Sequence, residues 1–165
     1  MKRKIAGDKT YYDLLESPVG RLYLTFIATM LTDVSFEKPK EIPLKKTRYS
    51  GLVKKELTEY FEKGRREFTF KTDFVEGTVF EKLVWNALKE IPYGETRTYK
   101  WMAEKIGSPR AFRAVGNALG KNPLPLIFPC HRIIESDGSL GGYTGGTEVK
   151  RRLLEIEFYP RSSQS

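Results

Sequence analysis

The only cysteine and the only histidine of this 165-residue sequence are neighbours, Cys130 and His131. A thiol becomes a strong nucleophile when it loses its proton, and a nearby imidazole or guanidinium lowers its pKa toward that state. Arg132 follows the pair directly, and the apolar residues 126–128 precede it. The alternative is that Cys130 is simply a small buried hydrophobic residue. Adjacent side chains on a strand point to opposite faces, so contact between the thiol and the imidazole requires a turn or a bridging water.

The scarcity of these two residue types limits the other chemistry that the chain can perform. A single cysteine excludes a disulfide within the chain, and one cysteine with one histidine cannot form a Cys/His zinc site. We therefore expect no metal and no cofactor. The longest apolar stretch, Leu22 to Leu31, is about half as long as a membrane span and contains two threonines. We expect a cytoplasmic protein without membrane association, in which the thiol stays reduced.

The charge of the chain favours an anionic partner. Lys and Arg outnumber Asp and Glu by 29 to 21, which leaves a net charge of +8 at pH 7. Residues 97–121 carry six basic residues against one acidic residue, Glu104, and so hold +5 of that total. A concentrated basic window is typical of contact with DNA or RNA, although any single lysine in it is better explained by a solvated helix face. We therefore expect the partner to be nucleic acid.

The same basic window has the pattern of a helix-turn-helix. Apolar residues recur at helical spacing over 99–106 and again over 112–119, and Gly107 with Ser108 separates the two segments. In the second segment, polar side chains lie opposite Phe112, Val115 and Leu119, and small residues keep the surface low enough for a duplex to approach closely. The residues expected on this surface are Arg110, Arg113, Ala114 and Asn117.

The first part of the sequence predicts short strands and one helix. The strands are punctuated by turn residues, which indicates an antiparallel meander. An amphipathic helix is predicted over 51–63, with Ser50 as its N-cap and Gly64 at its end. The predicted strands cover residues 11–16, 21–28, 31–36 and 68–74.

The second part changes character at Gly77. Thr78 and Glu81 form a capping box, which predicts a helix over 79–90. Three prolines between Lys121 and Cys130 predict an extended, buried segment that leads to the thiol. Further along, the sequence predicts a hairpin turn at 137–138 and an amphipathic helix over 148–158. We therefore predict an α+β fold with a small α/β domain over residues 1–76 and a mainly helical domain over 77–165.

Four stretches of the second part are similar to one protein family, the methylated-DNA–protein-cysteine methyltransferases, which repair O6-alkylguanine in DNA. The stretches are Arg113–Leu119 (RAVGNAL), Asn122–Pro123, Pro129–Ile134 (PCHRII) and Gly142–Gly146 (GYTGG). The resemblance covers nearly all of residues 78–158, whereas the first 75 residues agree in layout only. It implies a ribonuclease H-like first domain and a winged-helix-like second domain. Some members hold a structural zinc in the first domain, but this chain has no Cys or His before Cys130.

The resemblance also implies roles for five residues. Cys130 would attack the alkyl carbon on O6 of guanine and keep the alkyl group as a thioether. His131 would act as a base through an intervening water, and Glu157 would orient the imidazole. Tyr99 would donate a proton or hydrogen bond to the departing guanine, although its spacing also fits a plain core tyrosine. Asn122 would act as a hinge between the second helix and the thiol, although a turn-forming Asn before Pro123 is the alternative.

The resemblance further implies binding to the minor groove of double-stranded DNA, with the target nucleotide flipped out of the stack because the duplex hides O6 from a buried thiol. Arg113 would fill the space that the base leaves. We expect a monomer, and O4-alkylthymine is a second candidate substrate. The expected DNA contacts are Tyr99, Arg110, Arg113, Ala114, Asn117 and Arg132. The expected base pocket comprises Leu119, Ile133, Tyr143, Thr144 and Gly145.

Two other functions compete with this hypothesis. A helix-turn-helix regulator with a packing or redox-sensing cysteine would bind a specific DNA sequence and form no covalent product. A Cys-His hydrolase would explain neither the basic window nor the segment around Arg113.

Overall fold

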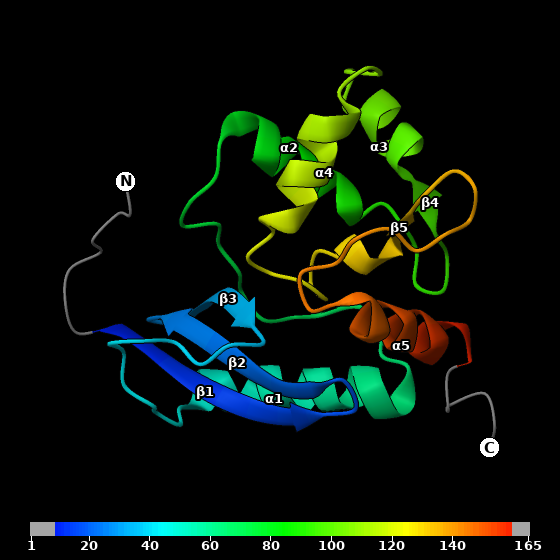
Figure 1. Ribbon diagram of the computed structural model, residues 1–165. Helices are drawn as coiled ribbons and strands as arrows, with labels where there is room; N and C mark the ends of the chain where they lie inside the picture. Colours follow the sequence, from blue (N-terminus) through cyan, green and yellow to red (C-terminus); the bar gives the residue numbers. More distant parts are fainter. Residues whose placement is uncertain (1–8, 160–165) are drawn as a thin grey trace. The chain divides into compact units, whose positions relative to one another are not determined.

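The computed structural model describes residues 9–159. The chain forms two compact units, and it passes from the first to the second between Glu76 and Gly77 (Figure 1). The first unit is a sheet with one helix and the second is mainly helical, which confirms the α+β prediction. Among residues 9–159, no helix is both long and apolar enough to span a bilayer.

The sheet of the first unit is the predicted antiparallel meander. Its strands β1 (Thr10–Ser17), β2 (Gly20–Ile27) and β3 (Met30–Ser35) pair in the order β1-β2-β3. In the central strand, every second side chain from Leu22 to Phe26 is fully buried, as the alternation of a strand with one covered face requires.

Helix α1 (Arg48–Lys63) begins three residues before the predicted start. Thr47, not Ser50, is the N-cap, and the two residues form a reciprocal capping box: the Ser50 amide donates to Thr47 Oγ1 at 3.1 Å, and the Thr47 amide donates to Ser50 Oγ at 2.9 Å. Ser50 is therefore the third residue of the helix. Gly64 ends the helix in the left-handed conformation, as predicted.

The strand predicted over 68–74 does not form. Only Thr72 makes an isolated bridge, to Leu31 of β3. Thr69 instead directs its amide and its hydroxyl to the carboxylate of Glu56, at 2.7 and 2.8 Å. A backbone amide that bonds a side chain is lost to strand pairing, so the segment pairs with β3 only around Thr72. There the Leu31 amide donates to the Lys71 carbonyl at 3.0 Å, and the Asp73 amide donates to the Leu31 carbonyl at 3.2 Å.

Three helices form the scaffold of the second unit. They are α2 (Val79–Leu88), α3 (Tyr99–Lys105) and α4 (Phe112–Gly120). The predicted capping box of α2 is present, and the helix ends two residues earlier than expected. The Trp85 indole of α2 donates to the Ala118 carbonyl of α4 at 2.7 Å, which anchors the second helix of the predicted helix-turn-helix, α3 and α4.

The segment before the thiol is buried, as predicted, but it is folded into turns and is not extended. The Phe128 amide donates to the Leu124 carbonyl at 2.9 Å, and Leu126 has a positive φ of 76°. Three prolines thus exclude a helix without enforcing an extended chain, because proline also favours turns. This compact segment ends in a single 3-10 turn, η2 (Cys130–Arg132).

The remaining elements hold this turn in place. Strand β5 (Ile133–Ile134) pairs in parallel with β4 (Arg97–Thr98), just before α3. A turn forms at 137–138 as predicted, but within residues 135–146 no strand follows it, so there is no hairpin. Helix α5 (Thr147–Phe158) begins one residue before the predicted start.

Candidate active site

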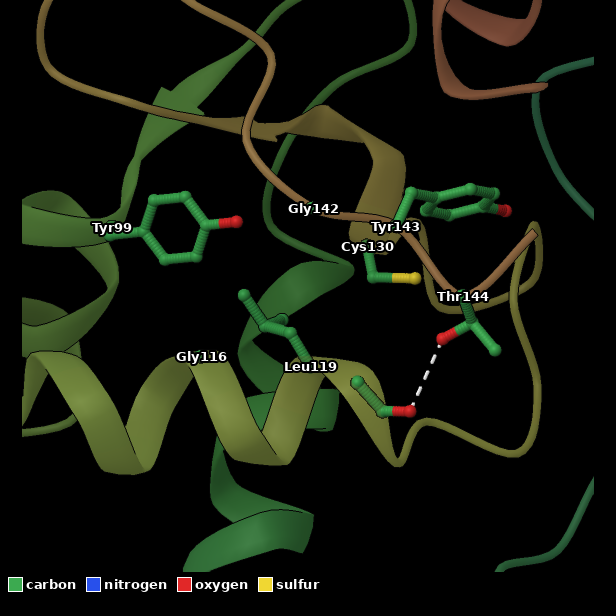
Figure 2. Close-up of a pocket in the computed structure, with 8 residues that line it drawn as sticks. Tyr99, Gly116, Leu119, Cys130, Gly142, Tyr143 and Thr144 are labelled. Atoms are coloured by element: carbon green, nitrogen blue, oxygen red, sulfur yellow. Dashed lines mark hydrogen bonds between the residues drawn. The ribbon is translucent and has the colours of Figure 1, made fainter. Parts of the chain in front are cut away.

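A pocket of about 280 Å³ opens beside Cys130 in the second unit (Figure 2). Tyr99 enters from the start of α3 with its hydroxyl pointing inward, and Leu119 lies on α4 below the thiol. The Thr144 hydroxyl donates to the Gly120 carbonyl at 3.1 Å, which ties the loop after β5 to the end of α4. The lining residues are Tyr99, Gly116, Leu119, Gly120, Cys130, Gly142, Tyr143 and Thr144.

Three of the five residues predicted to form the base pocket line it in the structure. Leu119, Tyr143 and Thr144 line the pocket, whereas Ile133 and Gly145 are not among the lining residues. Sequence reasoning missed the glycines at 116, 120 and 142. A glycine offers no side chain to reveal its role, so its contribution to a pocket wall becomes visible only in the folded chain.

Cys130 is the first residue of the 3-10 turn and is only 7% exposed. Burial raises the pKa of the thiol to about 11, although a hydrogen bond from Asn122 and the positive charge of Lys150 oppose the shift. The thiol is therefore protonated at neutral pH. Nucleophilic chemistry at this sulfur requires a group that takes its proton.

His131 is fully buried next to the carboxylate of Glu157, with Nε2 and Oε2 2.7 Å apart. Burial lowers the pKa of His131, although Glu157 opposes the shift, so the ring is neutral at pH 7. The neutral ring donates from Nε2 to the carboxylate, which leaves a lone pair on Nδ1. Within residues 9–159, no group hydrogen-bonds this buried Nδ1. The Nδ1 atom of the imidazole is thus able to accept a proton or a hydrogen bond.

Arg132 differs from the prediction, because it lies in the interior and not on a DNA-facing surface. It is 7% exposed, and its Nε and Nη2 donate to the two oxygens of Glu157 at 2.7 and 3.0 Å. Its Nη1 donates to the Ile91 carbonyl at 2.7 Å. Burial alone would raise the Glu157 pKa, but the bonds from His131 and Arg132 hold it well below its usual range. Glu157 is therefore a carboxylate.

Asn122 lies at the junction of α4 and the segment that leads to the thiol. Its side-chain amide donates to the Phe128 carbonyl at 2.8 Å, and its Oδ1 accepts from the Leu124 amide at 3.0 Å. The residue closes a turn and at the same time fixes the position of Cys130. The two interpretations left open by the sequence are thus compatible.

Lys150 is a buried charge that sequence reasoning missed. Its side chain is fully buried, and Nζ donates to the carbonyls of Ile133 at 2.6 Å and Gly142 at 3.2 Å. Burial lowers its pKa, and the negative charge of Glu135, joined by Cys130 when that thiol is ionised, opposes the shift. The signal was present in the spacing, because Lys150 shares the inward face of α5 with Leu153 and Glu157.

Two of the basic residues expected to contact nucleic acid are exposed: Arg113 on α4 and Arg110 just before that helix begins. Val115, Ala118 and Leu119 are buried, and Phe112, expected on the apolar face, is 48% exposed. The exposed residues of this surface include Arg110, Arg113, Ala114 and Asn117.

A helix-turn-helix with an exposed basic face and a buried thiol behind it defines a class, the DNA-binding proteins that carry out chemistry through a cysteine. The chain belongs to the 6-O-methylguanine DNA methyltransferase family: the family's DNA binding domain matches residues 79–158, and its ribonuclease-like domain matches residues 10–74. This membership confirms the predicted activity, direct repair of alkylated DNA by a methylated-DNA–protein-cysteine methyltransferase, over a non-enzymatic regulator.

Individual relatives cover nearly the whole chain. A methylated-DNA–protein-cysteine methyltransferase of Methanosarcina barkeri is 46% identical over 153 residues, which are 89% of this chain and 96% of that protein. One from Haemophilus influenzae is 40% identical over 91% of this chain and 87% of its own length. The crystal structure of Mycobacterium tuberculosis OGT in complex with DNA is 42% identical, with a TM-score of 0.82 over 90% of this chain and 92% of that one.

Proposed function

We propose that Cys130 accepts one alkyl group, irreversibly, from O6-alkylguanine in double-stranded DNA. The observation that carries this proposal is the position of the sequence's only thiol, which lines a pocket of about 280 Å³ and lies next in the chain to a neutral, Glu157-bound imidazole. A thioether is a poor leaving group, and the chain has no second cysteine to take the alkyl group over. Each molecule therefore reacts once.

His131 is the base for this reaction, and it acts through one bridging water. Nδ1 is the only ring nitrogen that can accept a proton, because Nε2 donates to the Glu157 carboxylate. As the thiol proton passes through the water to Nδ1, the sulfur electron pair forms a bond to the alkyl carbon. The bond between that carbon and O6 breaks, and its electron pair stays on the guanine.

Tyr99 supplies the proton that the departing guanine needs. Its hydroxyl points into the pocket, and burial together with the negative charge of Glu135 raises its pKa, so it remains a donor. The proton held by His131 then restores the phenol. In the net reaction the protein gains the alkyl group and the guanine gains the thiol proton, so no cofactor is required.

The exposed face of α4 binds the minor groove, where the small residues around Arg113 permit close approach. Arg113 occupies the place of the flipped nucleotide, which offsets part of the cost of extrusion, on the order of a few kcal/mol. The protein acts as a cytoplasmic monomer. Residues 1–76 form the first domain, and residues 77–165 form the domain that binds DNA and carries out the transfer.

The test is to incubate the protein with duplex DNA that contains one O6-methylguanine and to map the mass of its peptides. The peptide that bears Cys130 should gain the mass of one methyl group, while Cys130→Ala gains nothing. A wild-type protein that gains no mass, or a Cys130→Ala variant that gains the same mass, would refute the proposal. Undamaged duplex is the control for adventitious modification.

A further inference from the structure

Glu135 is an exposed carboxylate directly after β5, and it does not itself line the pocket. Its carboxylate lies close to Gly141, which adopts a positive φ of 72°. A Cβ atom at Gly141 would lie 2.9 Å from the Tyr99 hydroxyl and 3.3 Å from Glu135 Oε1. Both oxygens therefore lie against the same point of the loop, and Tyr99 lines the pocket beside the thiol.

The buried ammonium of Lys150 lies behind the wall of the pocket. It donates to the carbonyl of Gly142, which also lines the pocket. Both Cys130 and Glu135 interact electrostatically with this ammonium. Without Glu135, the wall would present the uncompensated positive charge of Lys150 to any group in the pocket. The negative charge of Glu135 balances the positive charge of Lys150 in the resting protein, in which Cys130 is a neutral thiol.

The balance affects the kind of alkyl group that the pocket admits. A methyl or ethyl group carries no charge and is insensitive to the field of the wall. A carboxymethyl group carries a negative charge, and it would lie between a sulfur that becomes negative in the reaction and a tyrosine flanked by Glu135. Charges of like sign at a partly desolvated site repel each other more strongly than they do in water.

We propose that Glu135 makes this protein select neutral O6-alkyl groups over anionic ones. This inference rests on the proposed function, because it assumes that the alkyl group is transferred in the pocket beside Cys130. Glu135 is not a catalytic residue. It acts through the electrostatic potential that it sets around Tyr99 and Lys150.

The test compares single-turnover transfer from two duplexes, one with O6-methylguanine and one with O6-carboxymethylguanine, at saturating protein so that DNA affinity does not enter the rate. In Glu135→Gln, the ratio of the methyl rate to the carboxymethyl rate should fall by about fivefold, through faster carboxymethyl transfer. Glu135→Asp, which keeps the charge, should retain most of the wild-type ratio. Glu104→Gln removes the same charge from an exposed site on α3 and should leave the ratio unchanged.

The outcomes separate the inference from the proposed function. If the wild type transfers no methyl group to Cys130, the proposed function fails, and the inference fails with it. If the wild type transfers methyl groups but the ratio in Glu135→Gln equals that of the wild type, the inference alone is wrong. An equal shift in Glu104→Gln also overturns it, because the effect would then be one of net charge. Since Glu135 is exposed, folding does not obscure the result.

Discussion

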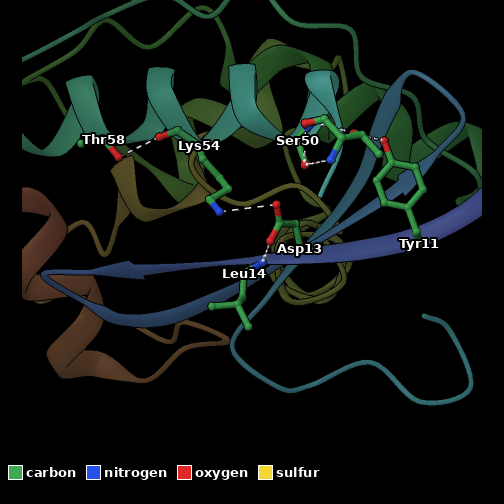
Figure 3. Close-up of polar contacts among 7 residues, drawn as sticks. Tyr11, Asp13, Leu14, Ser50, Lys54 and Thr58 are labelled. Carbon is green, nitrogen blue, oxygen red and sulfur yellow. Dashed lines mark hydrogen bonds and ion pairs between the residues drawn. The ribbon is translucent and has the colours of Figure 1, made fainter. Parts of the chain in front are cut away.

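Both units of this protein bury carboxylates that accept hydrogen bonds from neighbouring side chains. The units differ in whether those neighbours are themselves fully hydrogen-bonded. In the first unit, Asp13 accepts from the Leu14 amide at 2.8 Å and from Lys54 at 3.4 Å (Figure 3). Glu56 accepts from Thr69 and lies 2.7 Å from an Arg65 nitrogen. These carboxylates join the helix to the sheet and to the segment that follows the helix.

In the second unit, the buried carboxylate of Glu157 belongs to a cluster with His131 and Arg132 in which one polar atom has no hydrogen-bond partner among residues 9–159. Glu157 is saturated by His131 and Arg132, but the imidazole that it orients keeps Nδ1 without a partner among residues 9–159. A buried acceptor left unpaired costs about 1–3 kcal/mol, so a purely structural cluster would have paired it. Burial of charge therefore does not mark an active site by itself. The feature that marks this one is the buried Nδ1 of His131, which has no hydrogen-bond partner among residues 9–159.

The largest effect is expected from removing one carboxylate charge in each cluster. Glu157→Gln frees His131 and leaves Arg132 unbalanced, so single-turnover transfer should slow by about 10²–10⁴-fold. Glu56→Gln should leave the rate of the folded protein unchanged within about twofold, because the hydrogen bonds and ion pair of Glu56 join it to Thr69 and Arg65 of its own unit and to none of the pocket residues. Each variant should lose about 3–5 kcal/mol in the free energy of unfolding. Circular dichroism identifies a temperature at which both are folded, and equal rates would erase the distinction between the clusters.

A second contrast concerns exposed basic residues. Arg113→Ala removes the group that replaces the flipped nucleotide, so transfer from duplex DNA should slow on the order of tenfold to a hundredfold, while transfer from single-stranded DNA changes less. Lys55→Ala removes an exposed positive charge from α1 in the first unit and is the control. The measurement is the single-turnover rate on both DNA forms. Equal losses on both forms would assign Arg113 to general charge attraction.

A third prediction concerns stability at alkaline pH. Burial raises the Cys130 pKa from 9.0 to about 11, so the folded state holds the thiol proton more tightly than the unfolded chain. This contribution is complete below pH 9 and is lost as the pH rises toward 11. The wild type should therefore lose about 2–3 kcal/mol more than Cys130→Ser over that range in denaturant titrations. Parallel losses in the two proteins would contradict the tight burial of the thiol.

The smallest effect is expected from alkylation itself. An added methyl group overpacks the surroundings of Cys130 and should destabilise the second unit by about 1–3 kcal/mol. Amide hydrogen exchange before and after reaction should show faster exchange in α4 and in the segment 121–129, with residues 10–63 unchanged. Slower exchange in α4, or a raised melting temperature, would mean that the pocket accepts the group without strain.

The sequence predicted the elements that depend on local patterns. The strands of the meander, the capping box of α2 and the pair of helices around Gly107 follow from spacing and turn chemistry. Ser50 was misassigned because Thr47 and Ser50 are both good caps, and only their reciprocal bonds decide which one begins the helix. The segment 68–74 has strand composition, but the Thr69 amide donates to the buried carboxylate of Glu56 and is not available for pairing with a strand.

The residues of the candidate site that belong to a sequence motif could be predicted. Those brought to the site only by the packing of distant segments could not. Cys130 and His131 were conspicuous because each is unique in the chain. Arg132 was expected to contact DNA on the strength of the family resemblance, and nothing local reveals that Glu157, from another element, holds it in the interior. Lys150 and Glu135 escaped notice because their effect depends on the potential that they share across a loop.

The stoichiometry of transfer tests the central claim, that the incomplete cluster around Cys130 performs the chemistry, most directly. A limiting, known amount of protein is incubated with excess duplex containing O6-methylguanine, and both restored guanine and protein mass are followed to a plateau. The account predicts one restored guanine and one added methyl group for each molecule that carries the chain's single cysteine. Continued turnover beyond one guanine, or a methyl group on any peptide without Cys130, would contradict it.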